Sequence, residues 1–414
     1  MPRYRDLRHV AEYAPLFLTM TVRYGAMTLQ GIALGVLVYA RTGSPLLTAL
    51  SMFGPSFAQL LGAFTVLSLA DRVPPRAALV TAALTYAAAA ALAAVPGLPV
   101  AAILALVTAS GLVGVVAGGV QWGLLAEILP ADRYVLGRSL FTMSNGVMQM
   151  LGYGVGGLLV AATSPRVALL LAAAVHATAA GVARFGLTAR APRTGGSASL
   201  RRTWEGNRAL WATRRRRRLF VAMWVPNGLI VGCESVFVPY SPRWAGLLFA
   251  ASAGGMLAGD LLVARVLPVA LRRRVRTGLR LLLAAPYLTF MLGPPIAVAV
   301  GAVLIASVGY GSTLLLQEEL LATVPRRLTG HALGLQSSGL LAMQAVGATL
   351  AGVIAGLSSP TVTISAMAIA SVAVTLAVTL DAPDRPGARG PGSEPVTAAP
   401  PWAGSCDVVE GGGG

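Results

Sequence analysis

Long apolar segments recur along most of the chain. Crossing the hydrocarbon core of a bilayer, about 30 Å thick, takes roughly 20 apolar residues in a helix. Twelve segments near that length can be drawn between turn residues or arginines, and we expect twelve transmembrane helices. They cover residues 15–39, 47–70, 77–94, 99–125, 137–161, 166–182, 219–240, 244–266, 278–292, 295–317, 330–357 and 361–380. The pattern predicts an all-α integral membrane protein.

The composition agrees with a membrane protein and argues against several enzyme classes. Charged residues make up only 11% of the chain, against about a quarter in soluble domains. All 32 basic residues are arginine, so the chain has neither a P-loop lysine nor a Schiff-base lysine. The two cysteines and three histidines are scattered, and we expect no metal site. No nucleophile and base recur at a recognisable spacing, so we expect neither a cofactor nor enzymatic activity.

The arginines are distributed unevenly over the predicted loops. With twelve spans, 28 arginines fall on the side of both termini, Arg23 lies inside a span, and Arg41, Arg166 and Arg243 lie opposite. Short cytoplasmic loops collect basic residues, so we expect both termini in the cytoplasm and the spans in the plasma or inner membrane. We expect the cytoplasmic arginines to contact anionic lipids rather than nucleic acid. Residues 293–295 leave almost no loop, and an eleven-span count would place the termini on opposite sides.

A polar stretch divides the predicted spans into two sets of six, which match at an offset of 193 residues. The matches include Gly62 with Gly255, Arg72 with Arg265, Gly137 with Gly330, and Gly146 with Gly339. Parallel repeats of this kind place a substrate site near the midplane between the halves. The predicted organisation is a cytoplasmic N-terminus (1–14), an N-terminal six-helix bundle (15–187), an arginine-rich cytoplasmic linker (188–218), a C-terminal six-helix bundle (219–380) and a disordered cytoplasmic tail (381–414).

Two short motifs carry a family resemblance. Residues 69–76, Leu-Ala-Asp-Arg-Val-Pro-Pro-Arg, resemble the loop signature of the major facilitator superfamily, although Leu67 and Pro74 stand where glycines are usual. Residues 152–157 resemble its antiporter motif through Gly152, Gly156 and Gly157, with Tyr153 replacing a proline. The resemblance covers about residues 10–380. The resemblance implies a secondary transporter with alternating access. In this family the antiporter motif is usually found in exporters of drugs or natural products.

Charged residues near the cytoplasmic ends of the spans predict a gate. A carboxylate is stabilised at a helix N-terminus, so we expect Asp71 to contact the start of the span at residue 330 when the cytoplasmic side is closed. The second half has Ala264 at the matching position, and Asp260 lies one turn earlier on the same helical face. We expect Asp260 to act on Gly137 and Arg138; a local pair with Arg265 is the alternative. The predicted gate residues are Asp71, Arg72, Arg76, Arg138, Asp260 and Arg265.

Polar residues within the spans predict the lining of the cavity, because ionisable groups are costly in hydrocarbon and mark functional sites. Arg23 and Glu234 lie deep in the first and seventh spans, and Gln30 and Asn227 lie seven residues away from them on the same faces. In the resembled family these two spans line the cavity. We expect Arg23 and Glu234 to face it, with structural pairing between helices as the alternative. His176 is a possible proton carrier or a hydrogen-bonded packing residue.

These features predict a monomeric, proton-coupled exporter of a small apolar or amphipathic molecule. Family antiporters often carry an arginine in the fourth span, but residues 108–123 hold no charge, so coupling would depend on Glu234 and Arg23. The glycines at 152, 156 and 157 predict close helix approach or a bend. An uptake symporter of the same fold and a non-transporting membrane scaffold or receptor remain alternatives. An adaptable apolar cavity leaves no code for the identity of the substrate.

Overall fold

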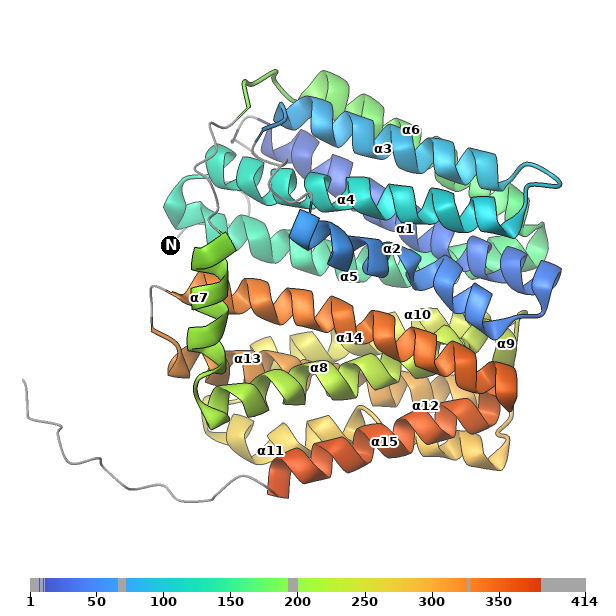
Figure 1. Cartoon of the computed structure of the whole chain (residues 1–414), viewed down its shortest axis with the longest axis vertical. Helices are drawn as coiled ribbons and strands as arrows, with labels where there is room; N and C mark the ends of the chain where they lie inside the picture. The colour runs from blue at the N-terminus through green and yellow to red at the C-terminus, as the bar shows by residue number, and fades with distance from the viewer. Residues whose placement is uncertain are drawn as a thin grey trace, which may run out of the picture. The chain divides into compact units, whose positions relative to one another are not determined.

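The computed structural model describes residues 7, 10, 12–65, 72–192, 200–325 and 328–380, and all their regular elements are helical. The first group of helices precedes residue 193 (Figure 1). It comprises α1 (Tyr13–Thr42), α2 (Pro45–Thr65), α3 (Pro75–Ala93), α4 (Val100–Ile128), α5 (Ala131–Ala162) and α6 (Pro165–Gly186).

The second group is more irregular and contains short π- and 3₁₀-helical turns. Its longer helices are α7 (Leu200–Trp211), α8 (Arg214–Ser235), α10 (Ala245–Leu261), α11 (Val269–Leu282), α12 (Ile296–Val308), α13 (Ser312–Thr323), α14 (Thr329–Leu357) and α15 (Pro360–Leu380). The short elements are α9 (Phe237–Tyr240), η3 (Leu262–Val266), η4 (Ala285–Leu292) and η5 (Gly309–Gly311).

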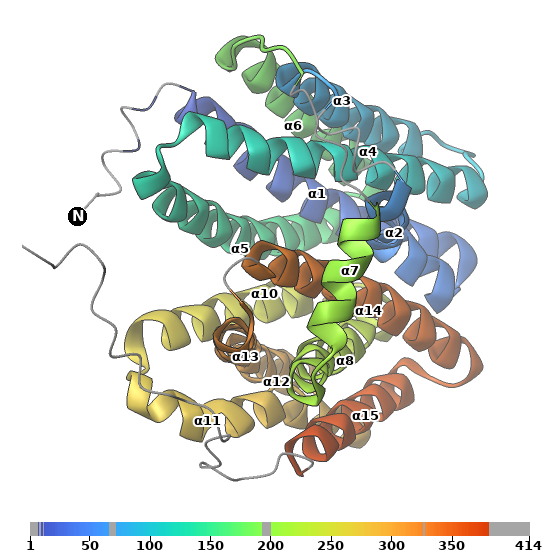
Figure 2. The same cartoon turned by 60° about the vertical axis from the view of Figure 1, so that its left-hand side comes forward.

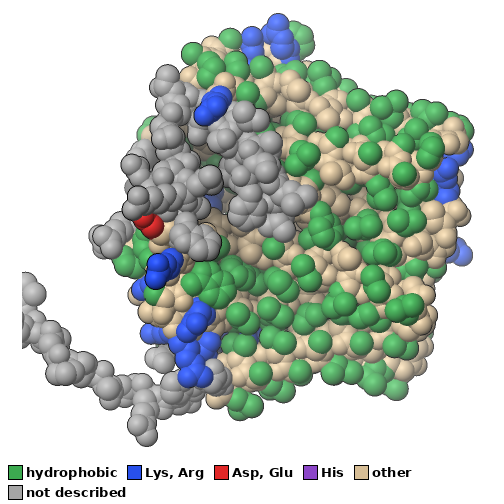
Figure 3. All heavy atoms as spheres, in the orientation of Figure 1, with side chains coloured by type: hydrophobic (Ala, Val, Ile, Leu, Met, Phe, Trp, Pro, Cys, Tyr) green, Lys and Arg blue, Asp and Glu red, His purple; other side chains and the backbone are tan. Residues whose placement is uncertain are grey.

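Ten helical segments of the described chain are long and apolar enough to cross a membrane. They are Tyr13–Thr42, Pro75–Ala93, Val100–Ile128, Pro165–Gly186, Arg214–Tyr240, Ala245–Val266, Arg274–Leu292, Ile296–Thr323, His331–Leu357 and Pro360–Leu380. Figure 3 shows hydrophobic side chains over most of the visible surface, with arginines toward the helix ends. Large apolar side chains such as Leu158 are 71% exposed, which suits a surface in contact with lipid. The prediction of an all-α membrane protein is confirmed. Helices α2 and α5 overlap two further expected segments but are not among the ten.

Prolines set several helix starts and interrupt two helices. Pro75 and Pro165 occupy first helical positions, where the missing N–H has no intrahelical partner to lose. Pro55 and Pro226 instead lie inside α2 and α8. There each ring removes a backbone hydrogen bond and clashes with the preceding turn, which favours a bend.

The helices pack mainly within their own group, as Figures 1 and 2 show. In the first group α1 contacts α5 and α6, and α4 contacts α2 and α3. In the second group α8 packs on α14, and α10 packs on α12. The two most extensive contacts between the groups are the crossings of α2 with α14 and of α5 with α10, with smaller contacts of α1 with α9 and of α2 with α8 and α9. Because the 193-residue offset maps α2 onto α10 and α5 onto α14, these two crossings correspond to one another in the repeat.

The expected linker at 188–218 contains a helix that the sequence interpretation missed. Helix α7 fills part of this segment, and α8 already begins at Arg214, so the five-arginine run forms its first turns. Trp211 at the end of α7 stacks on Phe220, with ring centroids 5.9 Å apart, and Leu210 is fully buried. The amphipathic spacing of α7 was the available signal. The predicted tail, 381–414, lies outside the described residues.

Candidate functional site

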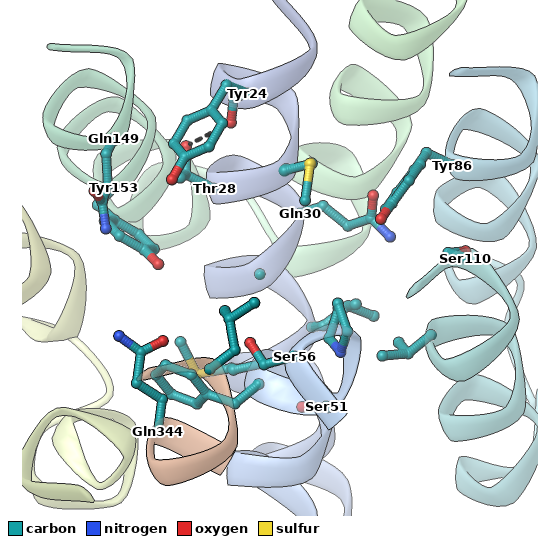
Figure 4. A pocket seen from close by; sticks show the side chains of 18 residues that line it. Tyr24, Thr28, Gln30, Ser51, Ser56, Tyr86, Ser110, Gln149, Tyr153 and Gln344 are labelled. Carbon is teal, nitrogen blue, oxygen red and sulfur yellow. Dashed lines mark hydrogen bonds between the residues drawn. The ribbon is translucent and has the colours of Figure 1, made fainter. Parts of the chain in front are cut away.

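A cavity of about 280 Å³ lies between helices of both groups (Figure 4). Its lining comes from α1, α2, α3, α4, α5 and α14. The lining residues are Tyr24, Met27, Thr28, Gln30, Gly31, Leu34, Ser51, Met52, Phe53, Pro55, Ser56, Tyr86, Val107, Ser110, Gln149, Tyr153, Leu341 and Gln344. None of them is charged.

Local sequence explains why space remains at this depth. A Cβ added to Gly31 of α1 would meet nothing within 4 Å, so this glycine leaves open room. Pro55 lies inside α2, and Gly111 of α4 packs directly against the Pro55 backbone. Gly31 of α1 and Pro55 of α2 both line the cavity.

The polar groups of the lining are neutral hydrogen-bonding groups. Figure 4 places Gln149 and Tyr153 on one side of the cavity and Tyr86 and Ser110 on the other. The hydroxyl of Thr28 donates to the carbonyl of its own helix at Gly25, at 2.9 Å. Tyrosine and amide side chains can bind neutral polar groups of a ligand, while the apolar residues cover its hydrocarbon parts.

Arg23 lies behind this lining rather than in it. Its guanidinium carbon is 6.0 Å from the ring centroid of Tyr86, and its Nη atoms lie 3.7 and 3.8 Å from the sulfurs of Met27 and Met20. The side chain is buried, its Nε has no hydrogen-bond partner, and no ion pair to it occurs in the described part of the chain. The structure therefore shows neither the expected exposure to the cavity nor a carboxylate partner.

His176 and Gln30 join Arg23 in one buried cluster. The Nε2 of His176 lies 3.1 Å from the Oε1 of Gln30, and its ring stacks on Tyr86 with centroids 5.3 Å apart. Since Gln30 and Tyr86 line the cavity, His176 is one layer behind it and holds two lining residues in place. This arrangement matches the packing alternative for His176, although Nδ1 has no partner.

Glu234 is enclosed within the second group of helices. Its Oε1 accepts a hydrogen bond from the Ser252 hydroxyl of α10, and Ser307 of α12 lies 3.2 Å from Ser252. Glu234 is 6% exposed and does not line the cavity. The two serines were missed from the sequence because single serines in an apolar span are common; their only signal was polarity.

Asn227 does not line the cavity but forms a hydrogen bond with a residue that does. Its Oδ1 accepts a hydrogen bond of 3.0 Å from Nε2 of Gln344, a lining residue of α14. Asn227 therefore orients an amide that reaches the cavity. Sequence reasoning did not single out Gln344.

The glycines of residues 152–157 lie where α5 crosses two other helices. A Cβ at Gly152 would collide with Thr28 of α1, and one at Gly157 would collide with the backbone of Gly246 of α10. Gly156 faces Leu29 of α1 in the same way. Tyr153 lines the cavity and stacks on Phe249 of α10, with centroids 4.8 Å apart. The motif thus combines close helix packing with one cavity residue.

Among the predicted gate residues that the structure describes, no hydrogen bond or ion pair joins one to another in this conformation. Asp71 lies outside the described residues. Arg138 lies over the Trp122 ring at 5.3 Å, and Arg76 donates to the carbonyl of Leu187 at 3.4 Å. Arg72 and Arg265 are exposed.

Asp260 contacts neither of its two expected partners. Its Oδ1 is buried without a hydrogen-bond partner, and no ion pair to Arg138 or Arg265 is found among the described residues.

Comparisons with solved structures identify the fold. A peptide transporter, POT, in complex with sulfate superposes with a TM-score of 0.68 at 15% identity, covering 92% of this chain and 98% of the other. The nucleoside transporter NupG gives 0.68 at 11% identity, with coverages of 89% and 98%. A bacterial homologue of the human lysosomal transporter Spinster, inward-facing and unoccupied, gives 0.66 at 13% identity, with coverages of 92% and 96%. The sequence has no significant match among curated proteins.

A family model also matches the sequence itself. The model of the Major Facilitator Superfamily aligns with residues 16–317, which include eight of the ten candidate membrane segments in whole or in large part. The resemblance inferred from residues 69–76 and 152–157 is thereby confirmed for the superfamily. This chain belongs to the Major Facilitator Superfamily.

Proposed function

We propose that this protein is a secondary active transporter that exports a small, neutral, amphipathic molecule in exchange for protons by alternating access. The observation that carries the proposal is the uncharged cavity between the two helix groups, together with the buried carboxylate of Glu234, whose partner Ser252 lies on the helix that stacks on the cavity residue Tyr153. Twelve spans in two bundles, with both termini in the cytoplasm, are part of the proposal.

The helix crossings support alternating access. Gly157 meets Gly246 where α5 crosses α10, and Leu46 lies against Gly352 where α2 crosses α14. Both contacts are at the helix ends opposite α7 (Figure 1). At the α7 end, Arg138 and Asp260 remain unpaired with each other. Rocking the groups about the cavity would open the glycine contacts while bringing the opposite ends together.

The lining supports a small neutral substrate. A volume of about 280 Å³ is near the lower limit of about 300 Å³ for ligand pockets. No lining side chain can form an ion pair, whereas Tyr24, Tyr86, Tyr153, Gln149 and Gln344 offer hydrogen bonds and flat apolar faces.

Glu234 is the proposed proton carrier. An ionised carboxylate is costly to bury unless it is paired, and the partner found here is the neutral hydroxyl of Ser252. A protonated carboxyl group would remove that cost, and opening of the second group to water would release the proton. Ser252 lies one helical turn from Phe249, which stacks on the cavity residue Tyr153. A substrate that displaces Tyr153 would therefore move α10, whose Ser252 donates the hydrogen bond to Glu234.

Transport into everted vesicles with an imposed pH gradient tests this function. A screen of amphipathic compounds should find a substrate that accumulates when the lumen is acidic and stops accumulating when the gradient is collapsed. Accumulation only in right-side-out vesicles would instead identify an uptake symporter. No transport of any compound in either orientation would favour a non-transporting scaffold.

The Glu234→Gln variant tests the coupling separately. The amide keeps the size of the side chain but cannot exchange a proton, so gradient-driven accumulation should fall by at least tenfold while passive counterflow of substrate persists. Glu318→Gln is the matched control, because Glu318 is 59% exposed and pairs with Arg272. Undiminished gradient-driven transport by Glu234→Gln would remove Glu234 from the mechanism.

A further inference from the structure

Two arginines meet the last turn of α15, where α8 and α11 pack beside it. Nη2 of Arg218 donates to the carbonyl of Val378 at 3.0 Å. Nη1 of Arg280 donates to the hydroxyl of Thr379 at 3.1 Å. Arg218 thus binds a backbone carbonyl in the last described turn of α15. Both guanidinium groups are therefore held at one place by the same helix turn.

Several N–H donors at this place have no acceptor. Arg280 is 6% exposed, and both its Nε and its Nη2 are buried without a hydrogen-bond partner. Nε of Arg218 is also buried and unpartnered. A buried donor left without an acceptor is destabilising, and more so when it carries a charge. Among the residues that the structure describes, three donors on two neighbouring cations thus have no anionic partner.

The neighbouring charged side chains that the structure describes do not supply an anion for these donors. Arg218 and Arg276 are close enough to repel the charge of Arg280, and Glu319 is the carboxylate that attracts it. Both oxygens of Glu319 are already engaged, Oε1 by Arg215 at 3.0 Å and Oε2 by Arg276. In the described part of the chain, Glu319 thus pairs with Arg215 and Arg276 and is also the carboxylate nearest in effect to Arg280. We call Arg218, Arg276 and Arg280 the α15 arginine cluster.

We infer that the α15 arginine cluster binds a phosphate group, that of an anionic phospholipid. Planar guanidinium groups match phosphate oxygens with two parallel hydrogen bonds each. The cluster lies at the end of the helices where α7 and the arginine run of α8 also lie, beside the hydrophobic surface (Figures 1 and 3). Phospholipid phosphates occupy that boundary of a bilayer.

The entry route for the phosphate runs past the exposed arginines. Arg276 is 34% exposed and Arg218 is half-buried, so their long side chains can swing outward. The phosphate then takes the place of the carbonyl and carboxylate contacts that these side chains make here. Arg280 stays in position because Thr379 and the packing around α11 hold it.

Native mass spectrometry of the full-length protein tests the inference. The protein is titrated with phosphatidylglycerol and, in parallel, with phosphatidylcholine of the same chain length. Arg280→Gln and Arg218→Gln should each weaken retention of phosphatidylglycerol by at least tenfold. Retention of phosphatidylcholine should not change.

The matched controls are Arg217→Gln and Arg274→Gln, which remove an exposed arginine from the same two helices. One basic residue near an anionic surface is worth about fivefold through charge alone, so the controls should stay within that range. Equal losses in all four variants would reduce the cluster to diffuse attraction and overturn the specific site. Unchanged lipid retention in Arg280→Gln and Arg218→Gln would also overturn it.

A titration with inorganic phosphate distinguishes a phospholipid headgroup from a free phosphate ion as the bound group. For a lipid site, millimolar phosphate should neither stabilise the delipidated protein against heat nor displace phosphatidylglycerol. Stabilisation by phosphate that is lost in the same two variants would reassign the cluster to a free anion. If Arg280→Gln does not fold, Arg280→Lys keeps the charge without the fork of donors, and Arg218→Gln changes a half-buried position; both should still lose phosphatidylglycerol selectively.

Discussion

Arg23 is enclosed by an aromatic face and two thioethers rather than by a carboxylate. The face of Tyr86 and the sulfurs of Met20 and Met27 are weak partners for a cation, so burial of this guanidinium depends on its flat shape and on cation–π attraction. A cation behind a neutral lining also imposes a positive potential on the cavity. This potential favours substrates whose electron-rich groups point toward Tyr86.

The Arg23→Lys variant measures how much the flat guanidinium matters. A lysine ammonium is compact and strongly hydrated, so it should lose the stacking on Tyr86 and lower the free energy of unfolding by about 2 kcal/mol. Transport should fall severalfold, as measured in vesicles. Arg184→Lys is the control, since Arg184 lies 5.9 Å over the highly exposed ring of Phe185. A fully active and stable Arg23→Lys protein would mean that charge alone is required.

At the scale of elements, the glycines decide which helices can cross closely. Gly157 has the backbone of Gly246 against it, whereas a Cβ at Gly154 would stand 3.4 Å from the Cβ of Ala250, an ordinary contact. The same motif therefore contains one position that cannot hold a side chain without moving α10 and one that can.

Gly157→Ala should separate α5 from α10 at the end opposite α7. Overpacking of this kind costs about 1–3 kcal/mol, which shifts a balanced equilibrium between conformations by fivefold or more. A reporter at the cavity, Ser56→Cys with Cys233 and Cys406 replaced by serine, should then be labelled faster by a membrane-impermeant maleimide from outside. Gly154→Ala should label at the parent rate. Equal rates for both variants would contradict a closing role for this crossing.

Glu12 connects the start of α1 to the segment after α6. Its carboxylate accepts hydrogen bonds from Thr188 at 2.7 Å and from both Nη atoms of Arg190 at 2.8 and 3.2 Å. Burial acts to raise the pKa of this carboxyl group, but the Thr188 hydrogen bond and the Arg190 charge outweigh it and place the pKa below its usual value.

A lowered pKa in the folded state makes this contact stabilising above the unfolded-state pKa, about 4.3 for glutamate. The stabilisation should disappear as the pH falls from that value through the folded-state pKa. As the pH is lowered from 7 to 3, the melting temperature should therefore fall more steeply for the parent protein than for the Glu12→Gln variant. The difference should be about 1 kcal/mol or less, because the pair is partly exposed. If the melting temperatures of the two proteins depend on pH in the same way, Glu12 does not contribute this pH-dependent stability.

At the scale of the whole molecule, the repeat relates the two crossings and predicts two equivalent latches at the α7 end. If Asp71 and Asp260 stabilise the starts of α14 and α5 only when that end is closed, removal of either should favour the conformation open there. A charge at a partly buried helix terminus is worth up to about 2 kcal/mol, enough for a shift of more than tenfold.

Asp71→Asn and Asp260→Asn should each increase labelling of the Ser56→Cys reporter from the cytoplasmic side, and the double variant should exceed both. Glu318→Gln, on an exposed pair, is the control. Moving the acid with Asp260→Leu and Ala264→Asp should restore part of the closed population. Unchanged labelling in the double variant would remove both latches.

Local chemistry was sufficient to predict the all-helical membrane fold, whereas the internal repeat stays a prediction. A bilayer requires apolar helices of a minimum length, so the apolar runs alone located the helices α1 to α6 and most of those from α8 onward. The predicted span 278–292 covers only the end of α11, because the start of that helix is rich in arginine. Matched glycines such as Gly146 and Gly339 predict the repeat from the sequence. Helix α7 was missed because a short amphipathic helix between arginines resembles a polar linker.

Which side chains line the cavity could not be predicted from the sequence pattern. Arg23 and Glu234 were expected in the cavity because ionisable residues within spans are usually functional, but the structure encloses both behind other side chains. Tyrosines and amides such as Tyr86 and Gln344 line it instead, and these residue types are ordinary in membrane helices. Which of them reach the cavity is decided by the rotation of each helix about its axis and by the helices packed against it. Those two quantities follow from contacts between residues more than a hundred positions apart, and only the tertiary structure sets them.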